Sequence, residues 1–588
     1  MLSPHSCHAC LSQRLLRSWF NYTLLSALAC LLITGCTKES DKSLPNNAGN
    51  PNSVASTKSE PPINLAFQDV TTASGVRSVY RNGEESDALS IVESIGGGVG
   101  VLDYDLSGTL DLIFPTGGNI AKDQPLSGLP ATLWRSDSDM RFTESSAAAQ
   151  VDSSNLYTHG VAIADIDNDG FPDVLVTGYR GLQLFYNMGD GTFQECSRAK
   201  GVESNLWSTS AAFGDFDNDG LVDIFIATYV DWSWQKNPSC LGNSPNGKDV
   251  CTPQVFTGEN DLVFWNQGDG TFTRSDSSNG LVAEGKGLGV IAADFDQDSK
   301  LDIYVANDTT NNFLYMNQGE RKLRESGVIA GCAMDHLGVP NGSMGVTLFD
   351  YDSDHKPDIF VTNYERETFA VYRNEGLGNF RCISERTGVT AFGLLYVGFG
   401  TVSGDFACKG REDLIVSNGH VMRYPGSGKR DQEPMYIEST KQGKLILHDF
   451  GPDNYFSKGH TGRGVVASDL NSDGLLDLVF SHVNQPATVL RNDSKTKGNW
   501  LKIQLIGTEV NRDAIGAQVI VKTNRGQHLR SVIGGGSYLS QGDYVLHWGM
   551  GEGELPLEAS ISWGDGTTQT IASLNPNTLL TIVQPLRN

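Results

Sequence analysis

The chain has 588 residues, more than a single hydrophobic core of roughly 100–200 residues holds, so a repeat architecture or several domains is expected. Hydrophobic residues make up 39% and charged residues 19%, a balance that excludes wholesale disorder. The formal net charge of −25 argues against sequence-independent binding to nucleic acid and against electrostatic adhesion to anionic lipid. The 66 glycines follow no Gly-X-Y period, which excludes collagen and favours a turn-rich β protein.

The amino-terminal segment has the features of an export signal. Arg14 and Arg17 precede an apolar run at 24–33. A membrane-spanning helix needs about 20 apolar residues, so this run is too short to be one and fits the apolar region of a signal peptide. The run leads into Ile-Thr-Gly-Cys36, which resembles a bacterial lipobox, whose cysteine is lipidated. We predict a lipoprotein signal peptide at 1–35, lipidation of Cys36 and a flexible tether at 36–63. The protein is then an exported, membrane-anchored bacterial lipoprotein, periplasmic or at the cell surface. An ordinary secretory signal and an uncleaved anchor remain alternatives.

Six cysteines follow the predicted lipidation site, and an even number in an exported chain permits disulfides. Only Cys240 and Cys251 lie close enough in sequence to predict as a pair. The other four have three possible pairings, or some of them stay free: Cys196, Cys332, Cys382 and Cys408.

One pattern recurs seven times: an apolar pair, then D-x-D-x-D-G-x-x-D, then a β-branched run. It is clearest as ADIDNDGFPD at 164–173 and GDFDNDGLVD at 214–223. We name the copies loop one to loop seven by their first aspartates, which are Asp103, Asp165, Asp215, Asp294, Asp350, Asp405 and Asp469. A second element, such as LFYNMGDGTF at 184–193, recurs after the loops and predicts a β-hairpin. Two hairpins in each repeat give four strands.

Seven four-stranded units predict an all-β fold with a seven-bladed β-propeller at 64–493. An insertion at about 231–256, which contains the Cys240–Cys251 pair, lengthens the third unit. Each hairpin is followed by a strand exit that ends in Gly-Val, as at 197–202 and 384–389. The segment 67–70 looks like a blade-final strand, yet it precedes loop one, and the last repeat lacks such a strand. We therefore predict that an N-terminal strand near 64–70 completes blade seven and closes the ring.

The recurring loop offers carboxylates at positions 1, 3, 5 and 9 and a backbone carbonyl at position 7. Six to eight hard oxygen ligands around a turn suit Ca²⁺, whereas His or Cys ligands would suit zinc. We predict about six structural calcium ions. The predicted ligands are Asp103, Asp105, Ser107, Thr109 and Asp111 in loop one; Asp165, Asp167, Asp169, Phe171 and Asp173 in loop two; Asp215, Asp217, Asp219, Leu221 and Asp223 in loop three; Asp294, Asp296, Asp298, Lys300 and Asp302 in loop four; Asp350, Asp352, Asp354, Lys356 and Asp358 in loop five; and Asp469, Asn471, Asp473, Leu475 and Asp477 in loop seven.

Loop six keeps Asp405 and Asp413 but has Ala407 and Lys409 where carboxylates are needed. We predict that it binds no metal and that Lys409 supplies a positive charge through a structural salt bridge. The alternative for all the loops is that aspartate only forms the turn. A further alternative concerns function: the calcium ions only brace the blades, because the ligands already fill most of an ion's shell.

The repeats resemble the FG-GAP (VCBS-type) repeats of integrin α-subunit propellers over 64–493. Four later motifs are similar to an ASPIC/UnbV domain at 494–588: NRDAIGA at 511–517, GGGSYLSQ at 534–541, HWGMG at 547–551 and WGDG at 563–566. The combination resembles the cartilage acidic protein family and its bacterial relatives. This resemblance implies a secreted, calcium-binding protein without assigned catalysis, with a role in adhesion or scaffolding. Independently, apolar and alternating runs between turn residues predict a small β-sandwich-like C-terminal domain.

The sequence contains no convincing catalytic constellation: it lacks a G-x-S-x-G elbow, a P-loop and an H-E-x-x-H motif. The glycine run at 96–100 precedes a strand and an Asp loop, so we interpret it as a tight turn into the first blade. His159, His420 and His460 lie at blade margins. Convergence of these histidines at a central channel would form a polar or metal site, and Arg463 near His460 would favour an anionic ligand. A structural role for each is the simpler interpretation.

Two hypotheses of function follow. The first is a non-catalytic adhesion, binding or scaffolding module for an unidentified protein or glycan, with no nucleic-acid partner and with membrane contact only through the lipid. The second is a propeller enzyme, such as a polysaccharide lyase or hydrolase, that uses residues of the central channel. A cluster of His, Arg, Lys or Tyr at one mouth of the channel distinguishes the second from the first.

Overall fold

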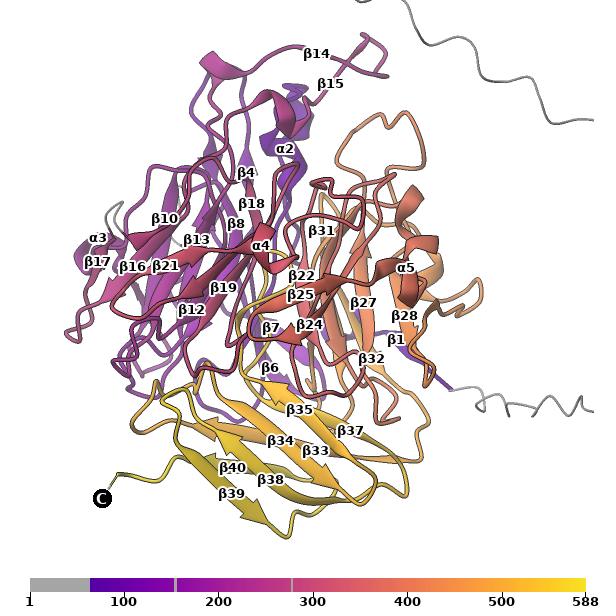
Figure 1. Ribbon diagram of the computed structural model, residues 1–588. Helices are drawn as coiled ribbons and strands as arrows, with labels where there is room; N and C mark the ends of the chain where they lie inside the picture. The colour runs from indigo at the N-terminus through magenta and orange to yellow at the C-terminus, as the bar shows by residue number, and fades with distance from the viewer. Residues whose placement is uncertain (1–63, 153–155, 276–278, 588) are drawn as a thin grey trace, which may run out of the picture. The chain divides into compact units, whose positions relative to one another are not determined.

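The computed structural model describes residues 64–152, 156–275 and 279–587, which form almost entirely β structure (Figure 1). The predicted signal peptide, the predicted lipidation site Cys36 and the predicted tether up to residue 63 lie outside the described residues. Within the described ranges, no helix is long and apolar enough to cross a membrane.

Seven antiparallel sheets of four propeller strands are present in the described residues. In chain order of their loops, they are β2 (Gly100–Leu102), β3 (Asp111–Phe114), β6 (Thr132–Ser138) and β7 (Arg141–Glu144); β8 (Thr158–Ala164), β9 (Asp173–Gly178), β10 (Gly181–Asn187) and β11 (Phe193–Glu195); β12 (Ser208–Gly214), β13 (Asp223–Thr228), β16 (Leu262–Asn266) and β17 (Phe272–Arg274); β18 (Gly287–Ala293), β19 (Asp302–Asn307), β20 (Phe313–Asn317) and β21 (Leu323–Glu325); β22 (Val346–Phe349), β23 (Asp358–Val361), β24 (Ala370–Gly376) and β25 (Asn379–Cys382); β26 (Gly398–Gly404), β27 (Asp413–Asn418), β28 (Met435–Ser439) and β29 (Leu445–Leu447); and β30 (Gly462–Ser468), β31 (Asp477–His482), β32 (Thr488–Asn492) and β1 (Phe67–Asp69).

The first strands of the sheets form a closed ring. Strand β2 contacts β8, and contacts continue through β12, β18, β22, β26 and β30, which in turn contacts β2. These strands are almost completely buried, because each faces its neighbours on both sides. The sheets therefore surround a central channel in the manner of a β-propeller.

The ring is closed by the N-terminal strand, as the sequence predicts. Strand β1 pairs antiparallel with β32, with Phe67 opposite Asn492 and Asp69 opposite Leu490. Phe67 is buried and meets Phe406 and Phe456 at ring-centroid distances of 6.1 and 5.7 Å. The first and last segments of the propeller thus share one sheet, which leaves no open edge at β32.

Four of the segments that follow the outer strands differ from the predicted strand exits, because each of the four forms one turn of helix. Four-residue helices occupy these places: α1 (Thr71–Ser74), α3 (Ser197–Lys200), α4 (Gly327–Ala330) and α5 (Ser384–Thr387). In α3, Gly201 has a φ of +79° and the Val202 N–H donates to the Ser197 carbonyl at 2.8 Å. The Gly-Val ending is therefore a helix C-cap, in which glycine takes the left-handed conformation and valine packs inward.

Short elements complete the propeller. The insertion at 231–256 carries the Cys240–Cys251 disulfide, while the other four described cysteines are free. Within it, the Asp249 carboxylate accepts the Tyr424 N–H at 3.2 Å, which joins the insertion to the sixth sheet. The short elements are α2 (Val92–Ile95), β4 (Gly118–Asn119), β5 (Ser127–Gly128), β14 (Cys240–Leu241), β15 (Lys248–Asp249), η1 (Glu84–Ser86), η2 (Trp234–Lys236), η3 (Pro253–Val255), η5 (Val389–Ala391), η6 (Gly393–Leu395) and η7 (Tyr455–Ser457).

The C-terminal residues form two sheets that share a hydrophobic core, in agreement with the predicted sandwich-like domain. One sheet contains β37 (Leu546–Glu552), β33 (Gly498–Ile506) and β40 (Leu579–Val583); the other contains β35 (Gln527–Ser531), β34 (Gln518–Thr523), β38 (Pro556–Ser562) and β39 (Thr568–Ala572). Their buried side chains continue into those of the propeller: Ile515 and Trp563 belong to the same cluster as Phe216 and Leu301. The two regions therefore pack as one core.

One segment of the C-terminal domain, residues 534–541, occupies the channel. Strand β36 (Gly534–Gly535) pairs with β18, and Ser537 forms a bridge with β22. The Leu539 carbonyl accepts an N–H of β8 at 3.1 Å, and Gln541 forms a bridge with β2. We call residues 534–541 the channel segment.

The channel segment is tightly enclosed. A Cβ on Gly534 would lie 1.8 Å from the Phe213 carbonyl oxygen, so only glycine fits at this position. The Tyr538 side chain is fully buried; its hydroxyl donates to the Ile95 carbonyl at 2.9 Å and its ring meets Phe399. The GGGSYLSQ motif therefore docks the C-terminal domain by filling the centre of the propeller.

Candidate metal centres

Each acidic loop joins the first and second strands of a sheet. In loop two, the Asp165 carboxylate accepts the backbone N–H groups of Asp169 at 3.0 Å and Gly170 at 2.7 Å. Gly170 has a φ of +98°, which explains glycine at position 6. Position 4 also has a positive φ in all seven loops, at residues of several types such as Asn168 and Cys408. The first aspartate thus folds the loop around its own carboxylate.

The aspartate at position 9 is fixed from two directions. Asp173 accepts the Ile166 N–H from its own loop at 3.1 Å and the Asn187 N–H from the third strand at 2.7 Å. The residue is 1% exposed. Because one backbone donor belongs to the loop and the other to the third strand of the same sheet, the fold sets the position of this carboxylate.

In five loops, the carboxylates at positions 1, 3 and 9 converge, with one oxygen from each lying within 4.8 Å of the others. We call these groups the carboxylate triads. They are Asp103, Asp105 and Asp111; Asp165, Asp167 and Asp173; Asp215, Asp217 and Asp223; Asp294, Asp296 and Asp302; and Asp350, Asp352 and Asp358. The aspartates at position 5 lie outside the triads and stabilise the turn, as where Asp169 accepts the Phe171 N–H at 2.8 Å.

The triads concentrate negative charge that neighbouring arginines neutralise only in part, as where Arg135 contacts one of the three carboxylates of loop one. Burial raises the pKa of Asp215 to about 7 and that of Asp294 to about 6. Burial, followed by the neighbouring Asp513 carboxylate, raises the pKa of Asp165 to about 7. Burial and carboxylate repulsion both disfavour the ionised form, whereas a bound cation would favour it. Three converging oxygens from carboxylates, with no nitrogen or sulfur donor among them, fit a hard cation such as Ca²⁺.

Loops six and seven differ from the other five. In loop six, the Lys409 ammonium lies 2.6 Å from the Asp413 carboxylate, and this is the salt bridge that the sequence predicts. In loop seven, the Lys502 ammonium of the C-terminal domain lies 2.5 Å from the Asp469 carboxylate. The sequence prediction counted loop seven as a metal site, but it did not include this lysine.

Sequence reasoning also missed a set of buried asparagines at the ends of the third strands. Asn266 donates to the Val222 carbonyl of its own loop at 3.1 Å and to the Ile166 carbonyl of the preceding loop at 2.9 Å. The same pair of bonds recurs at Asn187, Asn317, Asn374 and Asn492. We call these residues the inter-sheet asparagines. Their signal was present in the recurring LFYN, VFWN, LYMN and VYRN motifs.

The three histidines of interest have separate surroundings. His159 accepts the Trp207 indole N–H and contacts the Tyr80 hydroxyl, each at 2.9 Å, and burial lowers its pKa to about 3. His420 lies 3.6 Å from Glu365, and His460 stacks on Tyr455 at 4.4 Å. The rings thus have different partners, and each is integrated into the packing of its own region.

Arg463 lies in the channel wall and is 1% exposed. Its guanidinium donates to the carbonyls of Ser94, Ile95 and Gly462 and stacks on Phe399 at 3.9 Å. Gly96 approaches closely, since a Cβ there would lie 2.2 Å from the arginine. The glycine run at 96–98 therefore provides room for buried side chains.

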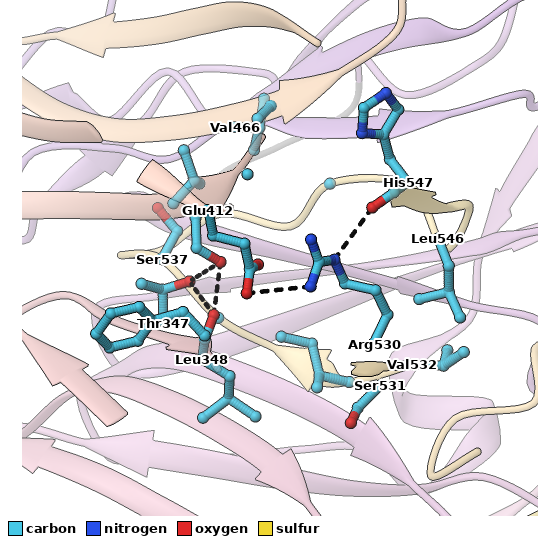
Figure 2. Close-up of a pocket in the computed structure, with 18 of the residues that line it drawn as sticks. Thr347, Leu348, Glu412, Val466, Arg530, Ser531, Val532, Ser537, Leu546 and His547 are labelled. Carbon is cyan, nitrogen blue, oxygen red and sulfur yellow. Dashed lines mark hydrogen bonds and ion pairs between the residues drawn. The ribbon is translucent and has the colours of Figure 1, made fainter. Parts of the chain in front are cut away.

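A cavity of about 220 Å³ lies between the C-terminal domain and the fifth to seventh sheets (Figure 2). Figure 2 shows Arg530 between Glu412 and the backbone of His547. The Arg530 guanidinium lies 3.1 Å from the Glu412 carboxylate and donates to the His547 carbonyl at 3.1 Å. Glu412 also accepts the Asp350 N–H at 3.0 Å, which connects the cavity to loop five. These charged groups are paired with each other across the two regions.

Comparisons with known proteins agree with this architecture. FG-GAP-like repeats match at 103–176, 165–226, 250–305 and 294–361, and an ASPIC and UnbV domain matches at 507–588. The chain is 28% identical to cartilage acidic protein 1 of Mus musculus over 307 residues, which cover 51% of this chain and 45% of that protein. The Homo sapiens protein is 27% identical over 51% of this chain and 44% of its own length. The alignments thus span less than half of each relative.

Among solved structures, an Agrocybe aegerita lectin that recognises non-reducing terminal N-acetylglucosamine is 17% identical to the chain, with a TM-score of 0.37. That match covers 68% of this chain and 94% of the lectin. The fold and its loops define a β-propeller protein in which carboxylates converge at five of the loops. More particularly, the chain belongs with the FG-GAP-repeat proteins that carry a C-terminal ASPIC and UnbV domain.

Proposed function

We propose that the protein is an exported, calcium-binding, membrane-anchored lipoprotein that acts as a non-catalytic adhesion or scaffolding module for protein or glycan. The observation that carries this proposal is the fivefold recurrence of a carboxylate triad at the same place in the sheet. The triads would hold Ca²⁺, with the carbonyls at position 7 as further oxygen donors. The ions would neutralise buried charge and stabilise the loop face, against which the C-terminal domain packs.

Contacts between the loops and the C-terminal domain support a scaffolding role for the ions. Asp513 accepts the Asp165 N–H at 2.7 Å, and the Asn168 side chain accepts the Arg512 N–H at 2.8 Å. In loop four, Gln518 donates to the Asp294 carbonyl at 3.2 Å. Ordering of the loops by Ca²⁺ would therefore also order the docking surface of this domain.

A binding role is favoured over the alternative of a polysaccharide lyase or hydrolase by the state of the channel. An enzyme of this kind would present reactive side chains to a substrate there. His159 and Arg463 instead have protein partners and are at most 1% exposed, while the channel segment fills the centre. The name of the curated relatives, cartilage acidic protein 1, agrees with a location outside the cell.

Calcium binding is tested by thermal unfolding with calcium and with a chelator, with magnesium as the control. A ligand present at 100 times its Kd stabilises the folded state by about 2.7 kcal/mol for each site. We expect calcium to raise the melting temperature by several degrees and magnesium to raise it less. Equal melting temperatures in calcium and chelator would contradict the proposal.

The binding role is tested with residues 38–588 on a glycan array and in a pull-down, each in calcium and in chelator. We expect a protein or glycan ligand that is retained in calcium, released by chelator and left chemically unchanged. Appearance of shortened or unsaturated glycan products would instead establish the enzyme. Mass spectrometry of the mature N-terminus tests the anchor, and an unmodified Cys36 excludes it.

A further inference from the structure

Loop seven has the backbone of the other acidic loops but a different charge. Asp469 accepts the N–H groups of Asp473 at 3.0 Å and Gly474 at 2.9 Å, as the first aspartate does elsewhere. Position 3, however, is Asn471, so positions 1, 3 and 9 provide two carboxylates where the triads have three. A cation at this loop therefore meets one negative charge fewer.

Lys502 enters this loop from the middle strand of a C-terminal sheet. Its ammonium lies 2.5 Å from the Asp469 carboxylate, and the two side chains are 10% and 3% exposed. The strand β33 is held on one side by β37 and on the other by β40. The Lys502 N–H also donates to the Thr578 carbonyl at 2.9 Å, so the backbone of this residue cannot withdraw without breaking a sheet.

The neighbouring Trp500 packs against the backbone of loop seven. A Cβ on Gly474 would lie 2.0 Å from the indole, which shows how closely the ring covers the loop backbone. The Lys502 ammonium lies 5.5 Å from the centre of the indole ring. A carboxylate, an aromatic ring and little solvent thus surround the Lys502 ammonium. These surroundings make the ion pair of Lys502 and Asp469 difficult to separate.

Basic side chains that contact the triads are more exposed than Lys502: Arg373, on the position-3 aspartate of loop five, is 18% exposed. Arg135 and Arg321 contact the position-3 aspartates of loops one and three, and each side chain is 42% exposed. Arg512 approaches the first aspartate of loop two, but at 3.6 Å and also at 42% exposure. The three side chains at 42% exposure can move into solvent when an ion binds, whereas Lys502 is 10% exposed and has no comparable path.

We propose that Lys502 is the resident cation of loop seven. Its ammonium takes the position of calcium at the first aspartate, so the chain binds five calcium ions and the C-terminal domain itself fills loop seven. This inference rests on the proposed function, in which the five triads bind calcium. It follows that attachment of the C-terminal domain at loop seven does not depend on calcium. Occupancy of the five triads, in contrast, changes with the calcium concentration.

The test counts bound calcium by native mass spectrometry in wild type, Lys502→Met and Lys497→Met. We expect five ions in wild type, six in Lys502→Met, where the ammonium is replaced by an apolar chain of similar length, and five in Lys497→Met. Lys497 is the control, because it also belongs to the C-terminal domain but is 80% exposed and lies 3.9 Å from Glu552. A sixth ion in wild type overturns the inference, and so does a folded Lys502→Met protein that still binds five.

Terbium luminescence locates the added ion. Excitation of Trp500 should sensitise terbium bound at loop seven, so Lys502→Met should show an increment of terbium luminescence over wild type. This increment should vanish in Lys502→Met/Trp500→Phe. An increment that survives the loss of Trp500 places the ion elsewhere and overturns the inference. The wild-type count is decisive even when the variant does not fold. A wild-type count of zero would refute the proposed function and this inference with it, whereas a count of six refutes only the inference.

Discussion

At the scale of single residues, the propeller depends on buried polar side chains that are hydrogen-bonded to the backbone. The inter-sheet asparagines each join their own loop to the preceding one, and Asn266 is 1% exposed. Blades one and six have Ser136 and Ser439 at the equivalent place. The recurring asparagine was visible in the sequence, but its role was not, because both of its acceptors are backbone carbonyls that no side-chain motif encodes.

Replacement of Asn266 by alanine should lower the free energy of unfolding by about 2–3 kcal/mol, because two buried carbonyls lose their donor. Urea denaturation measures this change. Asn379→Ala is the control: Asn379 is the exposed first residue of β25, where loss of its bonds should cost less than about 0.5 kcal/mol. Equal losses in the two variants would contradict the structural role of the asparagine.

His159 allows a test of burial through pH. Its folded pKa of about 3 is below its unfolded value of about 6.5, so the unfolded state binds more protons between these values. The stability contributed by the neutral histidine is therefore complete above pH 6.5 and falls as the pH is lowered. Comparison with His159→Gln cancels the other titrating groups. The difference in unfolding free energy should shrink by about 1 kcal/mol between pH 7 and 5.5; a constant difference would show that His159 is not buried as a neutral ring.

At the scale of elements, the repeat pattern predicted four-stranded sheets because each acidic loop and each hairpin is a local feature. It also predicted the role of segment 67–70, since the last repeat lacked a strand and the first had one too many. The strand exits were described incompletely: the Gly-Val ending marks a helix cap, and a single turn of helix is too short for periodicity to reveal.

The closure by β1 predicts that Gln68→Pro destabilises the protein, because proline removes a backbone N–H from the pairing with Arg491. We expect a loss of about 1–2 kcal/mol in urea denaturation and soluble aggregates in size-exclusion chromatography, since the edge of β32 becomes available. Gln68→Ala keeps the N–H and serves as the control. If both variants are equally stable, β1 does not close the ring in solution.

At the scale of the whole molecule, the C-terminal domain contacts the propeller in three places: the shared hydrophobic core, the central channel and loop seven. The sequence predicted two separate regions because a motif search evaluates each segment alone. The GGGSYLSQ motif was recognised, but its position in the channel depends on contacts with strands more than 200 residues earlier in the chain. Lys502 was missed for the same reason, because its partner Asp469 is distant in sequence and the lysine itself belongs to no motif.

Gly534→Val tests the channel segment. Because the added Cβ would lie 1.8 Å from a backbone oxygen, the segment should leave the channel and the protein should lose more than about 4 kcal/mol of stability. Hydrogen exchange should then accelerate in residues 534–541 and in β18. Gly526→Val is the control, since no atom lies within 4 Å of its added Cβ. Unchanged protection of β18 in Gly534→Val would contradict docking through the channel.

The central claim is that the five carboxylate triads are calcium sites, and the most direct test is the number of calcium ions bound to each chain. Equilibrium dialysis followed by elemental analysis should find five in wild type and four in Asp296→Ala, which removes one carboxylate from the triad of loop four. No bound calcium in wild type, or five ions in Asp296→Ala, would contradict the account.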